Sequence, residues 1–427
     1  MERIVFDNGF RLLLLHQADC PVCTLDVWVG VGSRYEQGYH GGISHLAEHM
    51  VFKSTHSRSS LEISLAMDDI GGAINAYTGQ EHTRYYVKTL GEYSEQALEL
   101  LADLLLHPAV PSRELELERE VVLEEIAMYE DSPEDLTHDL LVGQVWQKHP
   151  MGDLVSGTRE SVSAIEREEL LRFYGEHYVP NRMVMVCAGD FDRDSMLSAV
   201  ERLFGSLPAG EALPSQPSPW FCQGFALHPK DNEQVCMELG FPGLSSLDEE
   251  RHALSLFTCL LGDGESSRLF QRLREQLGLV YSVYAVNYAA IDGGVYTISV
   301  ATTPDKQLMV LKEIGGVLTC LLQDGITDEE LARAKKKVKT GLLMSLETVA
   351  ARAAREGRSE QLRGCSVPVE EVLSAWERVT KEDVLAVARR VLKQPCALAA
   401  VGPLLSEDTY RQVLAEFPGG FSPDAGN

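Results

Sequence analysis

His45-Leu46-Ala47-Glu48-His49 is the stretch around which the sequence is organised. Apolar residues recur at three- and four-residue steps across 43–51, which predicts an amphipathic helix. His45 and His49 then lie one turn apart on one face, with Glu48 beside them. Two such imidazoles are half of a tetrahedral zinc site, and a neighbouring carboxylate can take a proton from water. Two solvent-facing histidines on an ordinary helix would give the same five residues.

Size and charge narrow the class of protein. With 427 residues the chain exceeds one typical domain, and its net charge of −26 disfavours nucleic acid and anionic membrane as partners. No basic segment followed by an apolar one opens the chain, and Leu12–Leu15 is too short to span a bilayer. We therefore expect a cytoplasmic protein. The nine cysteines are scattered and resemble small core residues, although Cys20 and Cys23 have the spacing of a redox pair.

An internal repeat predicts the architecture. Residues 171–189 line up with residues 384–402, and a proline-rich segment separates the two copies. The fold class is therefore α+β with two homologous domains, each a mostly antiparallel sheet packed with helices. The predicted boundaries are 1–208 for the domain with the two histidines, 209–222 for a linker, and 223–420 for the second domain. Within the first domain, we expect strands 12–15 and 24–29 to pair with each other.

A second acidic helix offers a third ligand. Glu118 and Glu125 are seven residues apart in a predicted helix, so they share one face. An acidic helix usually presents a solvated face. Apolar neighbours flank this one, however, and a partly buried carboxylate needs a metal, a hydrogen bond or a counter-charge.

At this point the sequence resembles the M16 (pitrilysin-type, inverzincin) zinc metallopeptidases, in the subgroup of mitochondrial processing peptidases and their short bacterial relatives. The resemblance rests on the HxxEH motif, on 118–125 in the form E-R-x-V-x-x-x-E, and on Asn75-Ala76-Tyr77-Thr78 and His149-Pro150-Met151-Gly152. It implies Zn²⁺ held by His45, His49 and Glu125. It further implies Glu48 as the general base and Glu118 as a carboxylate behind the ligands.

The resemblance extends to the second half of the chain. There it implies that Arg274 and Tyr281, seven residues apart, hold the substrate backbone and the developing oxyanion. A surface arginine and a core tyrosine are the alternative, because the spacing alone is a weak motif. An extended substrate is expected to add a strand along 73–76, with Asn75, Ala76 and Phe52 as substrate-binding residues.

Two further acidic residues bear on specificity. Asp135 and Asp139 lie ten and fourteen positions after Glu125, where processing peptidases bind an arginine near the cleavage point. As i and i+4 residues of a helix they can converge on one guanidinium. Asp135 can equally serve only to start a helix after Pro133.

These observations predict a zinc metalloendopeptidase that hydrolyses short or unfolded peptides through a Glu48-activated water. One chain carries both the zinc half and the Arg274/Tyr281 half, so we expect a homodimer in which the pair acts in trans. The alternatives are a non-catalytic structural or interaction subunit of the same fold, or a factor dedicated to maturing one peptide.

Overall fold

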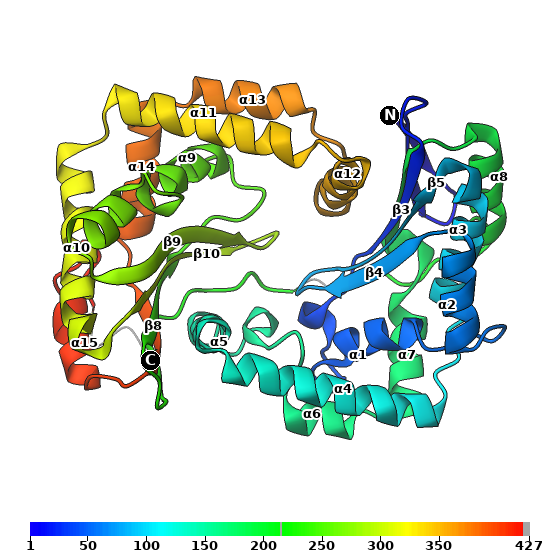
Figure 1. Ribbon diagram of the computed structural model, residues 1–427, viewed down its shortest axis with the longest axis horizontal. Helices are drawn as coiled ribbons and strands as arrows, with labels where there is room; N and C mark the ends of the chain where they lie inside the picture. The colour runs from blue at the N-terminus through cyan, green and yellow to red at the C-terminus, as the bar shows by residue number, and fades with distance from the viewer. Residues whose placement is uncertain (214–215, 422–427) are drawn as a thin grey trace. The chain divides into compact units, whose positions relative to one another are not determined.

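The computed structural model describes residues 1–213 and 216–421, which form two compact units (Figure 1). The first unit joins 1–127 with 153–213 and 344–367. The second joins 128–152 with 216–343 and 368–421. Of the predicted linker 209–222, residues 214 and 215 lie outside the described residues.

The first unit is built on a six-stranded sheet in the order β1-β2-β6-β3-β5-β4. Its strands are β1 (Glu2–Val5), β2 (Arg11–His16), β3 (Val22–Val29), β4 (Ala73–Thr78), β5 (Thr83–Leu90) and β6 (Met183–Gly189). β2 and β6 are parallel, and the other pairs are antiparallel. The expected pairing of 12–15 with 24–29 is wrong, because β6 lies between β2 and β3. Every residue of β6 is buried, and a continuously apolar strand is most stable inside a sheet.

The second unit repeats this plan. Its sheet has the order β7-β11-β8-β10-β9, which matches β2-β6-β3-β5-β4 strand for strand. The strands are β7 (Phe225–Pro229), β8 (Val235–Pro242), β9 (Val280–Ala289), β10 (Gly294–Thr302) and β11 (Ala397–Gly402). Again the first two strands are parallel and the rest antiparallel. The predicted duplication and the mostly antiparallel sheets are therefore confirmed.

Helices cover the sheets and complete each core. In the first unit these are α1 (Ile43–Val51), α2 (Ser60–Asp69), α3 (Ser94–Leu106), α4 (Ser112–Asp131), α6 (Arg159–Ala164), α7 (Arg167–His177), α8 (Arg193–Phe204) and α12 (Val349–Arg363). In the second they are α5 (Pro133–Val145), α9 (Arg251–Gly262), α10 (Gln307–Asp324), α11 (Asp328–Ser345), α13 (Val369–Arg378), α14 (Lys381–Leu392) and α15 (Glu407–Leu414), with a π-helical segment at Phe270–Gln276. None of the described helices is long and apolar enough to cross a membrane.

Each half of the sequence supplies one helix to the unit of the other half. α12, from the second half, lies against β3 and β6, where Val349 and Ala353 pack with Trp28. α5, from the first half, lies against β8 and β11, where Leu141 packs with Ala397. The compact units thus differ from the two contiguous sequence halves by this exchange.

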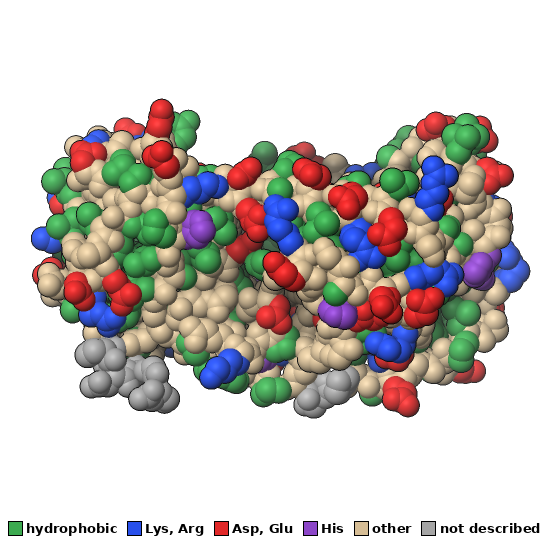
Figure 2. Space-filling view, turned by 90° about the horizontal axis from the view of Figure 1, so that it is seen from below, with side chains coloured by type: hydrophobic (Ala, Val, Ile, Leu, Met, Phe, Trp, Pro, Cys, Tyr) green, Lys and Arg blue, Asp and Glu red, His purple; other side chains and the backbone are tan. Residues whose placement is uncertain are grey.

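A buried ion pair lies on the face of the first sheet that α12 covers. Asp26 on β3 is fully buried, and Arg84 on β5 donates to both of its oxygens at 2.8 and 2.6 Å. This bidentate contact compensates the desolvation cost of burying the Asp26 carboxylate. Asp and Glu outnumber Lys and Arg by 64 to 38 in the sequence, and Figure 2 shows acidic side chains spread over one face with basic side chains among them.

Candidate metal centre and active site

The position just before α1 requires glycine. Gly42 has a left-handed φ of 89°, and a Cβ there would lie 2.6 Å from the carbonyl oxygen of Ser156. Gly42 has no side chain to cap the helix, and buried Glu36 does so from the preceding loop. Its carboxylate accepts the backbone N–H groups of Gly42 at 2.9 Å and Ser44 at 2.8 Å. Burial nevertheless raises the pKa of Glu36 to about 7, although these hydrogen bonds act in the opposite direction.

α4 presents its two predicted glutamates to α1. Glu118 is 6% exposed, whereas Glu125 is half-buried. Arg119 fastens this helix to the C-terminal end of α6, donating to the backbone carbonyls of Val162 and Ile165 at 2.6 and 2.9 Å. The acidic helix is therefore not a simple solvated face, because several of its polar side chains point inward and have partners.

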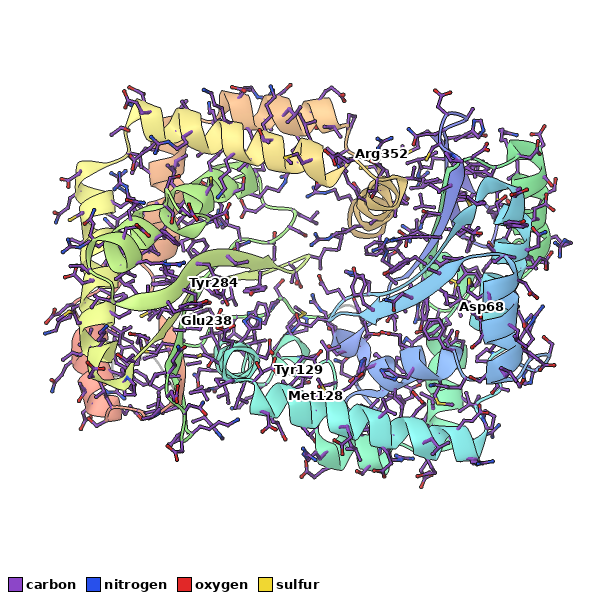
Figure 3. All side chains as sticks on the ribbon, in the orientation of Figure 1. Asp68, Met128, Tyr129, Glu238, Tyr284 and Arg352 are labelled. Atoms are coloured by element: carbon purple, nitrogen blue, oxygen red, sulfur yellow. The ribbon has the colours of Figure 1, made fainter. Side chains whose placement is uncertain are left out.

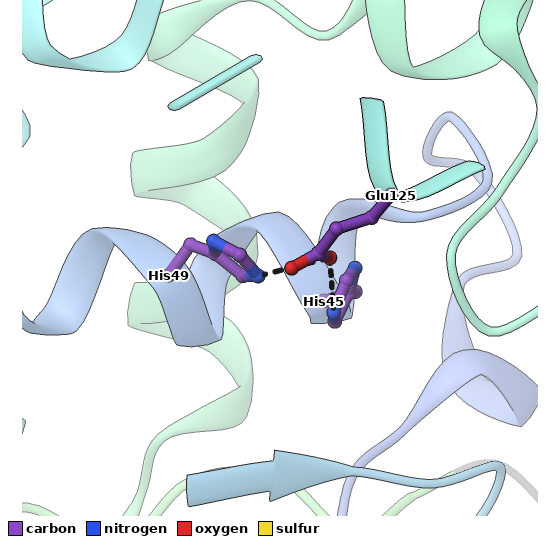
Figure 4. Close-up of side chains that lie close together, drawn as sticks. All are labelled: His45, His49 and Glu125. Carbon is purple, nitrogen blue, oxygen red and sulfur yellow. Dashed lines mark ion pairs between the residues drawn. The ribbon is translucent and has the colours of Figure 1, made fainter. Parts of the chain in front are cut away.

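His45, His49 and Glu125 converge (Figure 4). Glu125 Oε2 lies 3.7 Å from His45 Nε2 and 3.6 Å from His49 Nε2, and the three ligand atoms lie within 4.8 Å of one another. In the described part of the chain, no other group of three or more histidine, cysteine or acidic side chains has this arrangement. Burial, with a smaller effect from His49, lowers the pKa of His45 to about 4. His45 is therefore neutral at ordinary pH, and an imidazole lone pair is available.

The far sides of the two imidazoles differ. His49 Nδ1 lies 3.1 Å from Glu118 Oε2, and the other oxygen of Glu118 lies 2.5 Å from Lys53 Nζ. His45 Nδ1 is buried and has no hydrogen-bond partner in the described residues. A carboxylate behind an imidazole is how proteins commonly orient a metal ligand. With two nitrogens and one carboxylate oxygen facing one another, the side chains fit Zn²⁺.

Glu48 is held beside this group. The hydroxyl of Thr78, the last residue of β4, donates to Glu48 Oε2 at 2.5 Å. Burial raises the pKa of Glu48, while the hydrogen bond from Thr78 and the nearby His49 lower it. A carboxylate with a raised pKa is a better proton acceptor near neutral pH.

The predicted substrate-binding residues lie around β4. Asn75 and Ala76 belong to this strand, which is last in its sheet and has one edge that no described strand pairs with. Asn75 Oδ1 accepts the backbone N–H of Ala76 at 2.8 Å. Phe52 directly follows α1 and packs against the core, with its ring 6.1 Å from that of Tyr85.

Arg274 and Tyr281 lie together in the second unit. The Arg274 guanidinium stands 5.8 Å from the centre of the Tyr281 ring and 4.9 Å from that of Phe270. Tyr281 is 74% exposed, so the alternative of a core tyrosine is wrong. An exposed arginine–tyrosine pair can contact an extended peptide.

Asp135 and Asp139 lie on α5, which starts at Pro133. Proline suits the first helical turn, and the Ser132 side chain caps it by accepting the Asp135 N–H. Burial raises the pKa of Asp139.

His138, which lies between the two aspartates in sequence, ties α5 to the second sheet. Its Nδ1 lies 3.1 Å from Glu238 Oε2 on β8. Glu238, labelled in Figure 3, is buried and also accepts the Ser299 hydroxyl at 3.0 Å. The face of α5 that carries Asp135 and Asp139 is therefore fixed relative to this sheet.

Three residues at the site escape sequence reasoning. Glu36 acts through backbone groups six and eight positions away, and Lys53 acts on a carboxylate of another helix. Thr78 stands in the quoted Asn75–Thr78 motif, yet its contact with Glu48 depends on the fold. Of these, Lys53 has a local signal only in its closeness to His49, which it follows by four residues in the turn after α1.

Comparisons with known proteins give matches over most of the chain. The family model described as insulinase (peptidase family M16) matches residues 11–159, and the one described as the peptidase M16 inactive domain matches 164–338. A Bacillus subtilis protein named as an uncharacterized zinc protease is 36% identical, covering 94% of this chain and 98% of that protein. A Mycobacterium bovis protein named likewise is 37% identical, covering 98% and 97%.

Solved structures support the fold. A protease from Helicobacter pylori superposes with a TM-score of 0.87 at 24% identity, covering 94% of this chain and 99% of that one. A peptidase M16 inactive domain from Pseudomonas fluorescens gives 0.85 at 20% identity, covering 95% and 98%.

Proposed function

The chain belongs to peptidase family M16, and from that premise we propose that it is a zinc-dependent endopeptidase acting on short or unfolded peptides. The observation that carries the proposal is the convergence of His45, His49 and Glu125, with Glu48 held next to them by Thr78. His45, His49 and Glu125 would hold the ion. When bound, zinc supplies Lewis acidity that polarises a carbonyl and makes water a nucleophile at neutral pH.

Each of the remaining groups has a task in peptide hydrolysis. Glu48 takes the proton of the attacking water on its carboxylate and passes it to the leaving amine. Thr78 fixes the direction of that carboxylate. Arg274 and Tyr281 donate hydrogen bonds to the substrate and to the oxygen on which negative charge develops. The free edge of β4 pairs with the main chain of an extended substrate, which favours unfolded peptides over folded proteins.

Digestion of a peptide mixture, read by mass spectrometry, tests the proposal. Wild type should cleave internal bonds, and Glu48→Gln and excess chelator should each abolish cleavage. Glu124→Gln is the matched control, because Glu124 is an exposed neighbour of Glu125 on the same helix. If Glu48→Gln cleaves as well as wild type, the assignment of the general base is wrong. A wild type that binds zinc but cleaves nothing would favour the non-catalytic subunit.

Arginine selection is a finer proposal. It is supported by Asp135 and Asp139 one turn apart on a helix anchored through His138. The same digestion should place arginine two residues before the cleaved bond, and Asp139→Asn should weaken this preference. Cleavage indifferent to arginine would refute it.

We also propose the homodimer in which Arg274 and Tyr281 serve the zinc centre of the partner. Mixing Glu48→Gln chains with Arg274→Ala chains should then restore part of the activity. An active monomer without such restoration would exclude the arrangement. Cleavage confined to one peptide of the mixture would instead favour the dedicated maturation factor.

A further inference from the structure

Lys53 has a contact that its place in the chain does not explain. It lies two residues after Val51, the last residue of α1, and four positions after His49. Between them stands Glu118 of α4, 3.1 Å from His49 Nδ1 and 2.5 Å from Lys53 Nζ. One side chain of α1 and one from the turn that follows it thus hold one carboxylate of α4.

This contact differs from an ordinary surface ion pair. Surface pairs contribute little because water competes for both charges. Here the Glu118 side chain is only 8% exposed, while Lys53 is 32% exposed. A buried carboxylate that loses its cation must turn towards water. That turn would remove the acceptor from His49.

The orientation of His49 matters because an imidazole can present either nitrogen. The nitrogen that donates a hydrogen bond behind the ring leaves the other with the free lone pair. With Glu118 as acceptor, Nδ1 carries the proton and Nε2 faces Glu125 with its lone pair. His45 provides the contrast, since its Nδ1 has no partner in the described chain.

We propose that Lys53 is a positioning residue, which holds the Glu118 carboxylate on His49 Nδ1 and so fixes the tautomer of His49 before any metal binds. The inference rests on the proposed zinc function, but it concerns the metal-free protein. Lys53 also links α1 to α4 two helical turns from Glu125, so the same contact sets where Glu125 stands relative to the imidazoles.

The test is nitrogen-15 NMR of histidine-labelled, metal-free protein at about pH 8, above the usual pKa of histidine. His49→Gln identifies the signals of His49. In wild type we expect His49 as the Nδ1–H tautomer alone. Lys53→Met and Lys53→Gln should convert it to a mixture, Glu118→Gln should do the same, and Lys53→Arg should keep the wild-type pattern. In the Glu118→Gln background, Lys53→Met should change nothing further.

Lys381→Met is the matched control, because Lys381 is about as exposed and pairs with the exposed Asp328 at 2.9 Å. It should leave the His49 signals unchanged. Unfolding midpoints establish that each variant is folded, and either Lys53→Met or Lys53→Gln suffices for the comparison. A wild-type tautomer in a folded Lys53→Met or Lys53→Gln protein overturns the proposal. Failure of the protein to bind zinc would instead overturn the proposed function and leave this result standing.

Discussion

Glu36→Ala removes the carboxylate that caps α1, and its effect on stability should depend on pH in an unusual direction. Burial raises the pKa of Glu36 from 4.5 to about 7. A shift of that size corresponds to about 3 kcal/mol. The folded protein holds this proton more tightly than the unfolded chain, so the contribution of Glu36 is complete at low pH and falls as pH rises through 7.

The cap itself sets the size of the effect at low pH. Losing acceptors for two backbone N–H groups costs about 1–3 kcal/mol. We therefore expect Glu36→Ala to destabilise the protein by about 2 kcal/mol at pH 5. By pH 8 this loss should fall by up to about 3 kcal/mol, so that Glu36→Ala becomes as stable as wild type or slightly more stable, because the variant no longer buries an ionised carboxylate.

The difference in the free energy of unfolding is measured by urea unfolding of both proteins from pH 5 to 8, with chelator present. Titrating groups that the two proteins share cancel in this difference. Glu62→Ala is the control. Glu62 closes the capping box of α2 with Ser59 on the surface, and hydrogen bonds from Ser59 lower its pKa. Its contribution should be constant over this range, since it is lost only as pH falls through that lowered pKa. A Glu36→Ala difference that grows with pH would refute the reasoning, because the cap would then outweigh burial.

Three further changes follow from the contacts described above. Glu125→Ala should weaken zinc binding by more than about 100-fold in a chelator competition, since removing a ligand costs more than removing its neighbour, and unchanged affinity would exclude Glu125 as a ligand. Arg84→Met should lower the free energy of unfolding by about 3–5 kcal/mol, because it leaves Asp26 buried without its cation, and adding Asp26→Leu should recover most of that loss. Gly357→Ala should lower the free energy of unfolding by about 1–3 kcal/mol in urea, because the added Cβ on α12 would lie 2.2 Å from Nε1 of Trp28. Gly316→Ala, with no neighbour within 4 Å of the added Cβ, should be neutral or stabilising.

The sequence predicts what local periodicity determines. His45, Glu48 and His49 share one side of a helix because of its 3.6-residue repeat, and the same repeat places Glu118 and Glu125 on one face. The duplication is visible because residues 171–189 and 384–402 kept similar patterns. The assignment of Glu125 to the centre needed the resemblance to a family as well, since periodicity alone does not say which helices meet.

Contacts between distant segments escape such reasoning. Strands β2 and β3 were expected to pair because they are consecutive, yet β6 enters from residue 183 onwards and separates them. The apolar residues along one face of α5 or of α12 indicate that this face must be buried, but they do not say against which sheet. Glu36 appears as one more acidic loop residue until the fold brings it to the start of α1.

The exchange of α5 and α12 has a consequence for synthesis of the chain. At about 5–20 residues per second, the ribosome needs roughly 10–30 s to proceed from the end of β6 to the end of α12. During that interval α12 has not yet been made, so Trp28 and the face of β6 that packs against α12 remain uncovered. The nascent first half therefore exposes a hydrophobic sheet face. Expression of 1–208 alone would make this state permanent. Such a fragment should aggregate or bind chaperones, so the gene cannot be divided at its apparent midpoint without losing both products.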